Sequence, residues 1–331
     1  MQIKPIKFSP LVFPKIWGGN RIAALKKLDD APKNIGESFE VSALPDEETF
    51  EREGDDPRQP LSAIVRKYGP RLLGDKIYAQ YGTEFPLLVK IIDADEALSI
   101  QVHPDDVMAK RKGMPYGKTE MWYIIQTERD SQLLNGFNRD VQPDNFENML
   151  ADGSLMDTLN KYETHEGDSF YIPAGRIHSI GAGNMLIEVQ QSSGATYRVY
   201  DFDRRDDKGN SRELHIQESE EALDFHATQD GRIHYENKSL RNQAVLVKKS
   251  EYFTARVYRL DRPFVQNYEN LDSFVILVAW QGAATLTDGA GNKTRLAAGE
   301  SVLLPAENKS LEIVPEAGQP EFCCFETFIE R

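Results

Sequence analysis

The fold is decided by the stretch "GDSFYIPAGRIHSIG", which runs from Gly167 to Gly181. Gly167 is followed by five residues, Pro173, one residue, Gly175, two residues and then His178. The residues "DSFYIP" in the first half form a short run rich in β-forming side chains. The first glycine opens a strand from a tight turn, and the Pro-x-Gly turn aims the histidine inward. The pattern therefore predicts a strand followed by a turn that presents His178 to a pocket.

A shorter form of this pattern recurs near the C-terminus as "GESVLLPAE", residues 299–307. Both copies consist of Gly, five residues and Pro, with an apolar strand between them. The second copy continues as "AENKS" without a glycine or histidine. It therefore has no residue that corresponds to His178, and we expect no metal site in this part of the chain. The repeat indicates two related β units joined by the polar stretch 226–243. We place the first domain at 1–235 and the second at 236–331.

Most of the chain is predicted to form strands separated by turns. The β-rich runs are "FPLLVKIID", "EMWYIIQ", "DSFYIP", "MLIEVQQ", "YRVYDF", "NQAVLVKK" and "DSFVILVAWQG". Helical pattern is confined to 59–73, 144–162 and 211–225, and the second of these is interrupted at Gly153. Many strands at short spacing, with helices as excursions, favour a jelly-roll or barrel over a doubly wound parallel sheet.

A second informative stretch is "LSIQVHPDD", residues 98–106, which alternates apolar and polar side chains. Successive side chains of a strand point to opposite faces, so one face is polar and the other apolar. The polar face carries Ser99, Gln101 and His103, and the apolar face carries Leu98, Ile100 and Val102. The polar face of such a strand is commonly exposed to solvent, but it could also line a pocket.

Two further residues, Lys118 and Glu120 in "GKTEMWYII", lie two apart where a strand begins and therefore share a face. Glu120, together with Gln101, His103 and His178, offers a set of one carboxylate, one amide and two imidazoles, with no thiolate. This donor set suits Zn²⁺ and is also acceptable to Mn²⁺, Co²⁺ or Fe²⁺. We therefore expect strand ends to bring these residues to the mouth of a barrel.

Composition limits the classes of partner and location. The 331 residues are 40% hydrophobic and carry 39 basic against 53 acidic side chains, a net charge of −14, which opposes nucleic-acid binding. No apolar run is long enough to span a membrane, and the N-terminal sequence lacks the pattern of a secretory signal. Cys323 and Cys324 are adjacent and have no other cysteine to pair with. We expect a cytoplasmic protein with no evident obligate protein partner.

The spacing from Gly167 to His178 resembles the second signature of the cupin superfamily, except for that signature's trailing asparagine. Several blocks in addition resemble type I mannose-6-phosphate isomerase in its short form, in that family's order as far as residue 215. The blocks are "KIWGG" (15–19), "IGESFEVS" (35–42), "FPLLVKIIDADEALSIQVHPDD" (85–106), "GKTEMWYII" (117–125), "GDSFYIPAGRIHSIG" (167–181), "LIEVQQSSGATYRVYDFDR" (186–204) and "RELH" (212–215). The resemblance implies a mainly β fold: a catalytic cupin jelly-roll (double-stranded β-helix) domain with helical excursions, followed by a degenerate cupin-like β domain.

The resemblance also implies a set of site residues. Gln101, His103, Glu120 and His178 would bind one Zn²⁺ per chain. Arg198 matches an active-site arginine and Lys118 a lysine of the substrate pocket. Lys90 and Ser99 match positions that contact the phosphate of a sugar-phosphate substrate.

The implied reaction interconverts mannose 6-phosphate and fructose 6-phosphate through a cis-enediol. Arg198 would stabilise the enediolate, and Lys118 would position or protonate an oxygen. The group that takes the proton from carbon stays open among a hydroxide held by the metal, Lys118, His165 and His215.

One departure from the family pattern keeps other interpretations open. "SSGAT" places Gly194 where many members have an aspartate, so no role of that carboxylate transfers. The alternatives are a cupin isomerase of another sugar phosphate such as glucose 6-phosphate, an Fe²⁺-dependent cupin oxygenase, and a non-catalytic sugar-phosphate-binding cupin. A fourth, amide ligand and the adjacent Lys118 argue against the oxygenase, which usually uses two histidines and one carboxylate.

Overall fold

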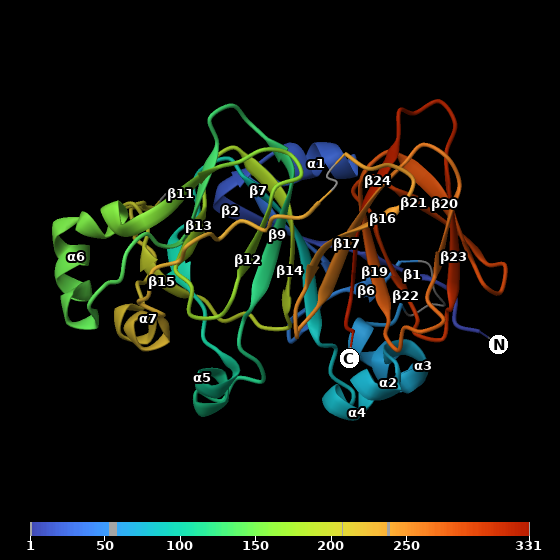
Figure 1. The fold of residues 1–331 in the computed structure, drawn as a ribbon, viewed down its shortest axis with the longest axis horizontal. Helices are drawn as coiled ribbons and strands as arrows, with labels where there is room; N and C mark the ends of the chain where they lie inside the picture. The colour runs from blue at the N-terminus through green and yellow to red at the C-terminus, as the bar shows by residue number, and fades with distance from the viewer. Residues whose placement is uncertain (1, 53–57, 207, 237–238, 331) are drawn as a thin grey trace.

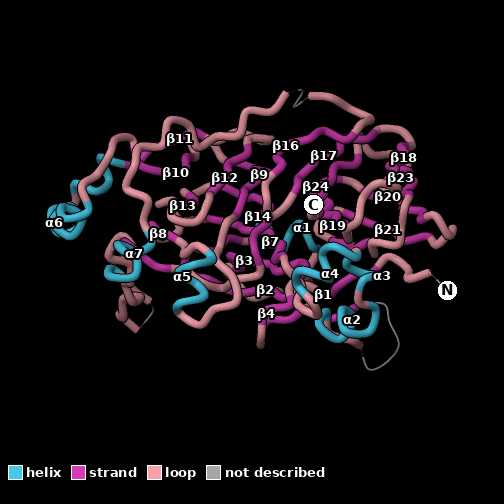
Figure 2. The backbone as a smooth tube through the Cα atoms, turned by 60° about the horizontal axis from the view of Figure 1, so that its bottom comes forward, coloured by secondary structure: helices cyan, strands magenta, loops and turns pink. Residues whose placement is uncertain are grey.

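The chain forms two β units that lie side by side in a computed structural model, which describes residues 2–52, 58–206, 208–236 and 239–330. Figure 1 shows the second unit in orange and red at one end of the molecule, with the first unit at the other. Strands fill the middle of the molecule and the helices lie at its periphery (Figure 2). The mainly β architecture with helical excursions confirms the predicted fold class.

The first unit is a roll of two antiparallel sheets. The strand order is β12-β9-β14-β7-β2-β3 in one sheet and β11-β10-β13-β8-β15 in the other. The strands of the six-stranded sheet are β12 (Ser169–Ile172), β9 (Glu120–Thr127), β14 (Asn184–Gln191), β7 (Leu87–Ala94), β2 (Leu11–Gly19) and β3 (Ile35–Val41). Those of the five-stranded sheet are β11 (Leu159–Glu163), β10 (Gln132–Phe137), β13 (His178–Ile180), β8 (Ile100–Val102) and β15 (Tyr197–Tyr200).

Apolar side chains from both sheets of the roll form an inner cluster, which includes Trp17, Trp122 and Phe170. A separate cluster contains Ile100 and Val102 of β8 and extends to α6 (Phe146–Asp152) and α7 (Ile216–Ala222). The predicted alternation in "LSIQVHPDD" therefore holds for Ile100 and Val102. It is wrong for Leu98, which precedes β8 and packs into the inner cluster.

The second unit also consists of two antiparallel sheets, which enclose their own apolar cluster. The seven-stranded sheet has the order β16-β17-β24-β19-β22-β1-β6 and the four-stranded sheet the order β18-β23-β20-β21. Their strands are β16 (Ala244–Lys249), β17 (Thr254–Leu260), β24 (Phe322–Phe328), β19 (Val275–Gln281), β22 (Ser301–Leu304), β1 (Ile6–Ser9), β6 (Phe50–Glu51), β18 (Phe264–Asn267), β23 (Ser310–Pro315), β20 (Ala283–Asp288) and β21 (Lys293–Ala297). Every β-rich run predicted from the sequence overlaps one of the strands observed in the two units.

The two units pack against each other through the largest apolar cluster of the chain. Val89, Met121 and Ile187 of the six-stranded sheet share this cluster with Ile276 and Phe325 of the seven-stranded sheet. As a result β7, β9 and β14 are buried along most of their length, since one face meets the second unit and the other faces the roll. Strands buried on both faces have nearly continuous apolar sequences, which explains runs such as "LLVKIIDA".

The N-terminus of the chain belongs in space to the second unit. Strands β1 and β6 extend the seven-stranded sheet, because β1 pairs with β22 on one side and with β6 on the other. A chain division at residue 235 stays a prediction, and the predicted junction at 226–243 includes residues 237 and 238, which lie outside the described residues.

The predicted helical segments are shorter and more broken in the structure. Segment 59–73 contains α2 (Leu61–Tyr68) and α3 (Pro70–Leu73), separated at Gly69, whose φ is +51°. Segment 211–225 contains only α7. In segment 144–162 the prediction is wrong at the end: α6 stops at Gly153 in a left-handed conformation, and Leu159–Glu163 form β11, which pairs with β10.

Other short elements did not follow from the sequence. They are α1 (Arg21–Lys26), α4 (Asp75–Tyr81), α5 (Asp106–Arg111), the 3₁₀ turns η1 (Pro143–Asn145) and η2 (Ser154–Thr158), and the hairpin of β4 (Ala43–Leu44) and β5 (Glu47–Glu48). No helix among the described residues is both long and apolar enough to cross a membrane.

The two copies of the glycine–proline pattern start strands in the same way. Gly167 and Gly299 both have φ of +81°, a left-handed conformation that L-residues with side chains rarely adopt. Strand β12 begins two residues after Gly167, and β22 begins two residues after Gly299. This common geometry supports the interpretation of two related units.

Candidate metal centre and substrate pocket

The six-stranded sheet contributes a row of polar side chains to the interior of the roll. Lys90 of β7 lies opposite Glu188 of β14, which in turn lies opposite Trp122 of β9. Glu120 of β9 lies opposite Gln190. Residues that are opposite each other in antiparallel strands share a face, so these groups project on the same side of the sheet.

The five-stranded sheet contributes a second row through β8. Gln101 lies between His178 of β13 and Arg198 of β15 in the strand register. The backbone N–H of Gly175 donates to the carbonyl oxygen of His103 at 2.9 Å. This hydrogen bond ties the Pro-x-Gly turn to the end of β8 and brings His103 close to His178.

The predicted ligand residues converge on one point. The ligand atoms of His103, Glu120 and His178 all lie within 4.8 Å of one another, and the three side chains are buried. Nε2 of His103 is 3.3 Å from Glu120 Oε2, and Nε2 of His178 is 3.5 Å from Glu120 Oε1. The side-chain amide of Gln101 is 3.2 Å from His178 Nε2. All four residues are therefore brought together: Gln101 from β8, His103 from the position directly after β8, Glu120 from β9 and His178 from β13.

The chemistry of this group fits a divalent cation. Nδ1 of His178 donates to the carbonyl oxygen of Arg176 at 2.8 Å, which leaves the lone pair of Nε2 directed toward Glu120. Among the described residues, neither carboxylate oxygen of Glu120 has a hydrogen-bond partner, although Oε2 lies 2.6 Å from the ammonium of Lys118. Two neutral imidazoles, a carboxylate and an amide oxygen are suitable ligands for Zn²⁺.

Burial and neighbouring charge keep these ligands in the protonation states that metal binding requires. Burial, with the nearby ammonium of Lys118, lowers the pKa of His103 to about 3, and burial lowers the pKa of His178 to about 4. Although burial alone raises it, the pKa of Glu120 is held well below its usual range by Lys118 and the histidines. At neutral pH the group therefore presents neutral imidazoles and an ionised carboxylate.

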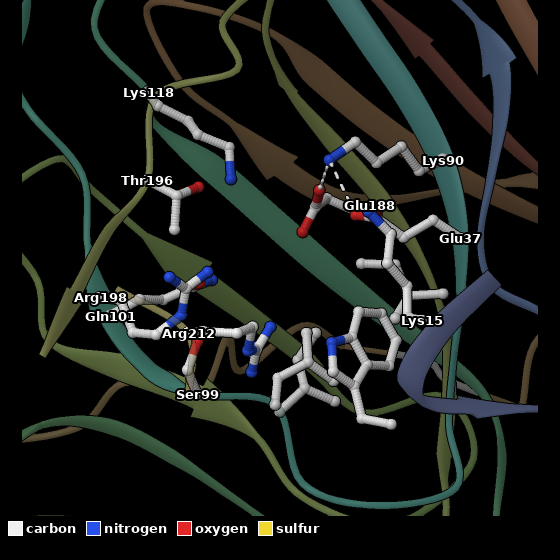
Figure 3. A pocket seen from close by; sticks show the side chains of 14 residues that line it. Lys15, Glu37, Lys90, Ser99, Gln101, Lys118, Glu188, Thr196, Arg198 and Arg212 are labelled. Atoms are coloured by element: carbon white, nitrogen blue, oxygen red, sulfur yellow. Dashed lines mark hydrogen bonds and ion pairs between the residues drawn. The ribbon is translucent and has the colours of Figure 1, made fainter. Parts of the chain in front are cut away.

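A pocket opens above this group and contains the other predicted site residues. Lys90, Ser99, Lys118 and Arg198 all line it, together with Gln101 (Figure 3). Lys118 connects the pocket to the ligand group, because its Nζ is 3.0 Å from Nε2 of His103. The structure thus brings all eight predicted site residues to one pocket or to the group beneath it.

Lys90 is paired with two carboxylates in the pocket wall. Its Nζ is 3.2 Å from Glu188 Oε1 and 3.5 Å from Glu37 Oε1, and it lies 4.9 Å from the ring centroid of Phe39. Despite burial, these carboxylates raise the pKa of Lys90. The second oxygen of Glu188 accepts a hydrogen bond from Trp122 Nε1 at 2.9 Å. Burial, with the neighbouring Glu120, raises the pKa of Glu188.

Three residues that the sequence left open have different surroundings. His165 is exposed beside Glu163 and does not line the pocket. His215 is the N-cap residue of α7 and accepts the backbone N–H of Arg198 through Nδ1, also away from the pocket lining. Gly194 has no described atom within 4 Å of the position of a Cβ, so the loop has room for a side chain there. It does not line the pocket, whereas Thr196 does.

Sequence reasoning missed several residues that line the pocket, above all Glu188, Glu37, Lys15 and Arg212. Glu188 lies in the apolar run "MLIEVQQ", where a lone charge in a buried strand was the available signal. Arg212 belongs to "RELH", which was recognised as a block but not as part of the site. The hairpin that carries Arg212 to the pocket is closed by a bridge between Arg205 and Ser211.

A β-roll that holds a buried His–Glu–His group beneath a polar pocket defines a cupin-type protein with a candidate metal centre. The family model for the catalytic domain of phosphomannose isomerase type I matches residues 6–123. Mannose-6-phosphate isomerase of Streptococcus mutans is 32% identical over 307 residues, which cover 93% of this chain and 94% of that protein. Mannose-6-phosphate isomerase ManA of Bacillus subtilis is 34% identical over 226 residues, 68% of this chain and 69% of that protein.

The fold agrees with these sequence relationships. The crystal structure of mannose 6-phosphate isomerase from Bacillus subtilis aligns with a TM-score of 0.86 at 27% identity, over 98% of this chain and 99% of that one. The chain belongs to the type I mannose-6-phosphate isomerase family, also called phosphomannose isomerase. The predicted resemblance, the cupin-type fold and the classification as an isomerase are confirmed.

Proposed function

We propose that the protein interconverts mannose 6-phosphate and fructose 6-phosphate, with one Zn²⁺ held by Gln101, His103, Glu120 and His178. The observation that carries the proposal is the convergence of these four residues, 77 positions apart at the extremes, beneath a pocket lined by cationic side chains. The names of the relatives from Streptococcus mutans and Bacillus subtilis support the same substrate. Lysines and arginines around the pocket suit a phosphorylated sugar.

The bound metal would supply a Lewis acid that polarises the carbonyl and hydroxyl oxygens of the sugar. The protein's own residues would then move the protons. The reaction transfers a proton between carbon 2 and carbon 1 through a cis-enediol, while a second proton moves between the two oxygens. Three groups at the pocket surface have suitable chemistry for these steps: Glu188, Lys118 and Arg198.

We assign Glu188 as the group that takes the proton from carbon 2 and returns it to carbon 1. It is a buried carboxylate at the pocket surface, and its raised pKa brings its proton affinity closer to that required of a general base. Lys90 and Trp122 fix its orientation through one oxygen each. The placement of His165 and His215 outside the pocket lining favours Glu188 over both as the carbon base.

Lys118 and Arg198 would act on the oxygens. The ammonium of Lys118 lies against the ligand group and can donate to the oxygen whose proton shifts. Arg198 faces the pocket with a guanidinium suited to stabilise the negative charge that develops on the enediolate. Ser99 and Lys90, which the family resemblance implies as contacts of the phosphate group, both line the pocket.

The test is a coupled isomerase assay on mannose 6-phosphate before and after chelation, with zinc, manganese, cobalt and iron added back separately. We expect activity to disappear with the metal and to return with zinc. Full activity after complete metal removal would contradict the proposal. Running glucose 6-phosphate in parallel separates this reaction from the isomerisation of another hexose phosphate, and oxygen uptake with added iron would point to an oxygenase.

A further inference from the structure

Two arginines lie close together in the pocket, and one of them has no carboxylate partner. Arg198 donates through Nη1 to the carbonyl oxygen of Glu213 at 2.7 Å. Its Nε is buried without a hydrogen-bond partner among the described residues, and no described carboxylate lies within ion-pair distance. Burial and the neighbouring charge of Arg212 both lower the pKa of Arg198. The two guanidinium groups therefore repel each other. An anion bound between them would relieve this repulsion.

Arg212 is held in a fixed orientation by Asp201. Nε of Arg212 donates to Asp201 Oδ2 at 2.8 Å, and Nη2 donates to Oδ1. This two-point pairing uses two of the five N–H groups of the guanidinium. The described residues provide no hydrogen-bond acceptor for the other three. Arg212 lines the pocket, so these N–H groups are available to a ligand that enters it.

The turn that carries Asp201 is strained. Phe202 and Asp203, directly after Asp201, have φ of +56° and +53°. Two consecutive non-glycine residues in the left-handed region carry a conformational cost, and such strain is typical of segments constrained by function. Asp201 itself is only 5% exposed and is also 3.5 Å from Arg204. The turn therefore holds a buried carboxylate whose main partner is a pocket-lining arginine.

The opposite side of the pocket is less favourable for a phosphate. The ammonium of Lys90 already lies near two carboxylates, those of Glu188 and Glu37. The negative charges of both carboxylates would repel a phosphate dianion placed beside Lys90. In Figure 3, Ser99 and Arg212 lie on the side of the pocket away from Lys90. Ser99 offers a hydroxyl group, and its side chain is almost fully buried at the pocket wall.

From these observations we propose that Arg212 binds the phosphate group of the substrate in a subsite shared with Ser99, and that Asp201 is the positioning residue for Arg212. The inference rests on the proposed function, because it names the part of the pocket that takes the phosphate of a sugar phosphate. The planar guanidinium with three unused N–H groups matches the geometry of phosphate oxygens. Lys90, which the resemblance implied as a phosphate contact, acts in this proposal as the counter-ion that orients Glu188.

The test measures binding of inorganic phosphate by calorimetry, and kcat and KM for mannose 6-phosphate, in metal-loaded variants. In Arg212→Gln we expect the dissociation constant of inorganic phosphate to rise about tenfold to a hundredfold, since hydrogen bonds to a charged group are lost. KM should rise with it while kcat changes less, because the contact is remote from the reacting carbons. Arg212→Lys keeps the positive charge but loses the planar array of N–H donors. Its dissociation constant for phosphate should lie between those of the parent and of Arg212→Gln.

Asp201→Asn tests the positioning role. It should raise the dissociation constant in the same direction but by less, without changing metal content. Arg205→Gln is the matched control, because Arg205 is an exposed arginine of the same hairpin that does not line this pocket. The paired variant Lys90→Met/Glu188→Gln, which removes the opposite cation without leaving its nearest carboxylate charged, should bind inorganic phosphate as the parent protein does.

The proposal is overturned if Arg212→Gln binds inorganic phosphate as tightly as the parent, or loses no more affinity than Arg205→Gln. It is also overturned if the Lys90 and Glu188 pair, rather than Arg212, proves necessary for phosphate binding. Thermal unfolding of each variant, with Arg212→Lys as the milder change, separates loss of the subsite from loss of the fold. Parent protein that binds phosphate through Arg212 but does not isomerise mannose 6-phosphate would contradict the proposed function and leave the subsite standing.

Discussion

Glu188 and Lys90 lie directly opposite each other in β14 and β7, with 3.2 Å between Oε1 and Nζ. Both are buried in the sheet that also carries Glu120. Burial and the neighbouring carboxylate of Glu120 raise the pKa of Glu188, although the ammonium groups of Lys90 and Lys118 oppose this effect. The pair therefore places a proton-accepting group at the surface of the pocket and fixes its direction.

Replacing Glu188 by Gln should abolish the proton transfer but retain the shape of the pocket. We expect kcat to fall by about a hundredfold to ten-thousandfold, the range for loss of a general acid–base group. Exchange of the carbon-2 hydrogen of mannose 6-phosphate with solvent should fall in parallel, as measured by NMR in deuterated water. Glu166→Gln, an exposed change on a surface turn, is the control. If exchange is undiminished in Glu188→Gln, a group other than Glu188 takes the proton from carbon.

Substitution of the candidate ligands should change the metal content of the protein. His103→Ala and His178→Ala each remove an imidazole from a buried group of ligands. Gln101→Ala removes only a neutral amide from the partly exposed edge. We expect both histidine variants to lose the metal, and activity to fall by at least about a hundredfold because the Lewis acid contributes several kcal/mol. Gln101→Ala should retain metal but release it more readily to a chelator.

Metal content is measured by inductively coupled plasma mass spectrometry after gel filtration. His215→Ala is the control, since His215 lies at the start of α7 away from the pocket lining. A full complement of zinc in His178→Ala would contradict the assigned site.

Local rules and the family resemblance together predicted the four candidate ligands that the structure brings close to one another. Ser99, Gln101 and His103 alternate on one short stretch, and the Pro-x-Gly turn before His178 has a geometry that depends on neighbouring residues alone. The same local rules predicted most strands of both units. Helices were harder: α6 looked longer in the sequence because Leu159 continues its apolar pattern, yet Leu159 begins β11 and pairs with β10.

Long-range pairing explains what the sequence did not reveal. Nothing local indicates that β1 pairs with β22, whose residues are almost 300 positions away. Glu188 was hidden for a similar reason, because its partner Lys90 lies on a strand far away in the chain. The proposed role of Arg212 depends on its pairing with Asp201 and on the strained turn that follows Asp201. The residue types in this turn do not predict its positive φ angles.

Glu37 provides a test by pH. Although burial opposes it, the ammonium groups of Lys90 and Lys15 lower the pKa of Glu37 to about 2 from an ordinary value of 4.5. Because the folded-state pKa is the lower one, this carboxylate stabilises the fold above pH 4.5 and loses that effect as the pH falls toward 2. We expect Glu37→Gln to lower the free energy of unfolding at pH 7 by about 2–3 kcal/mol.

The difference between Glu37→Gln and the parent should shrink between pH 5 and pH 3, as measured by urea unfolding. Glu166→Gln should show no such dependence. A constant difference across this range would show that Glu37 acts through packing rather than through its charge.

The contact between the two units includes a buried ion pair. Nζ of Lys26, at the end of α1, is 2.7 Å from Glu40 Oε1, and the side chains are 3% and 1% exposed. The same ammonium donates at 2.6 Å to the carbonyl oxygen of Gly299, in the turn that opens β22 of the second unit. Ser38 donates to Glu40 at 2.6 Å. Because Glu37 lies on the same strand, this pair also anchors a wall of the pocket.

Lys26→Met should leave Glu40 charged, buried and without its cation, which typically costs roughly 3–5 kcal/mol. The double variant Lys26→Met/Glu40→Leu removes both charges, so it should recover a large part of that loss. Urea unfolding followed by circular dichroism measures both, with the exposed Lys76→Met as control. If the single variant were as stable as the parent, the pair would be a consequence of the packing of the two units and not one of its causes.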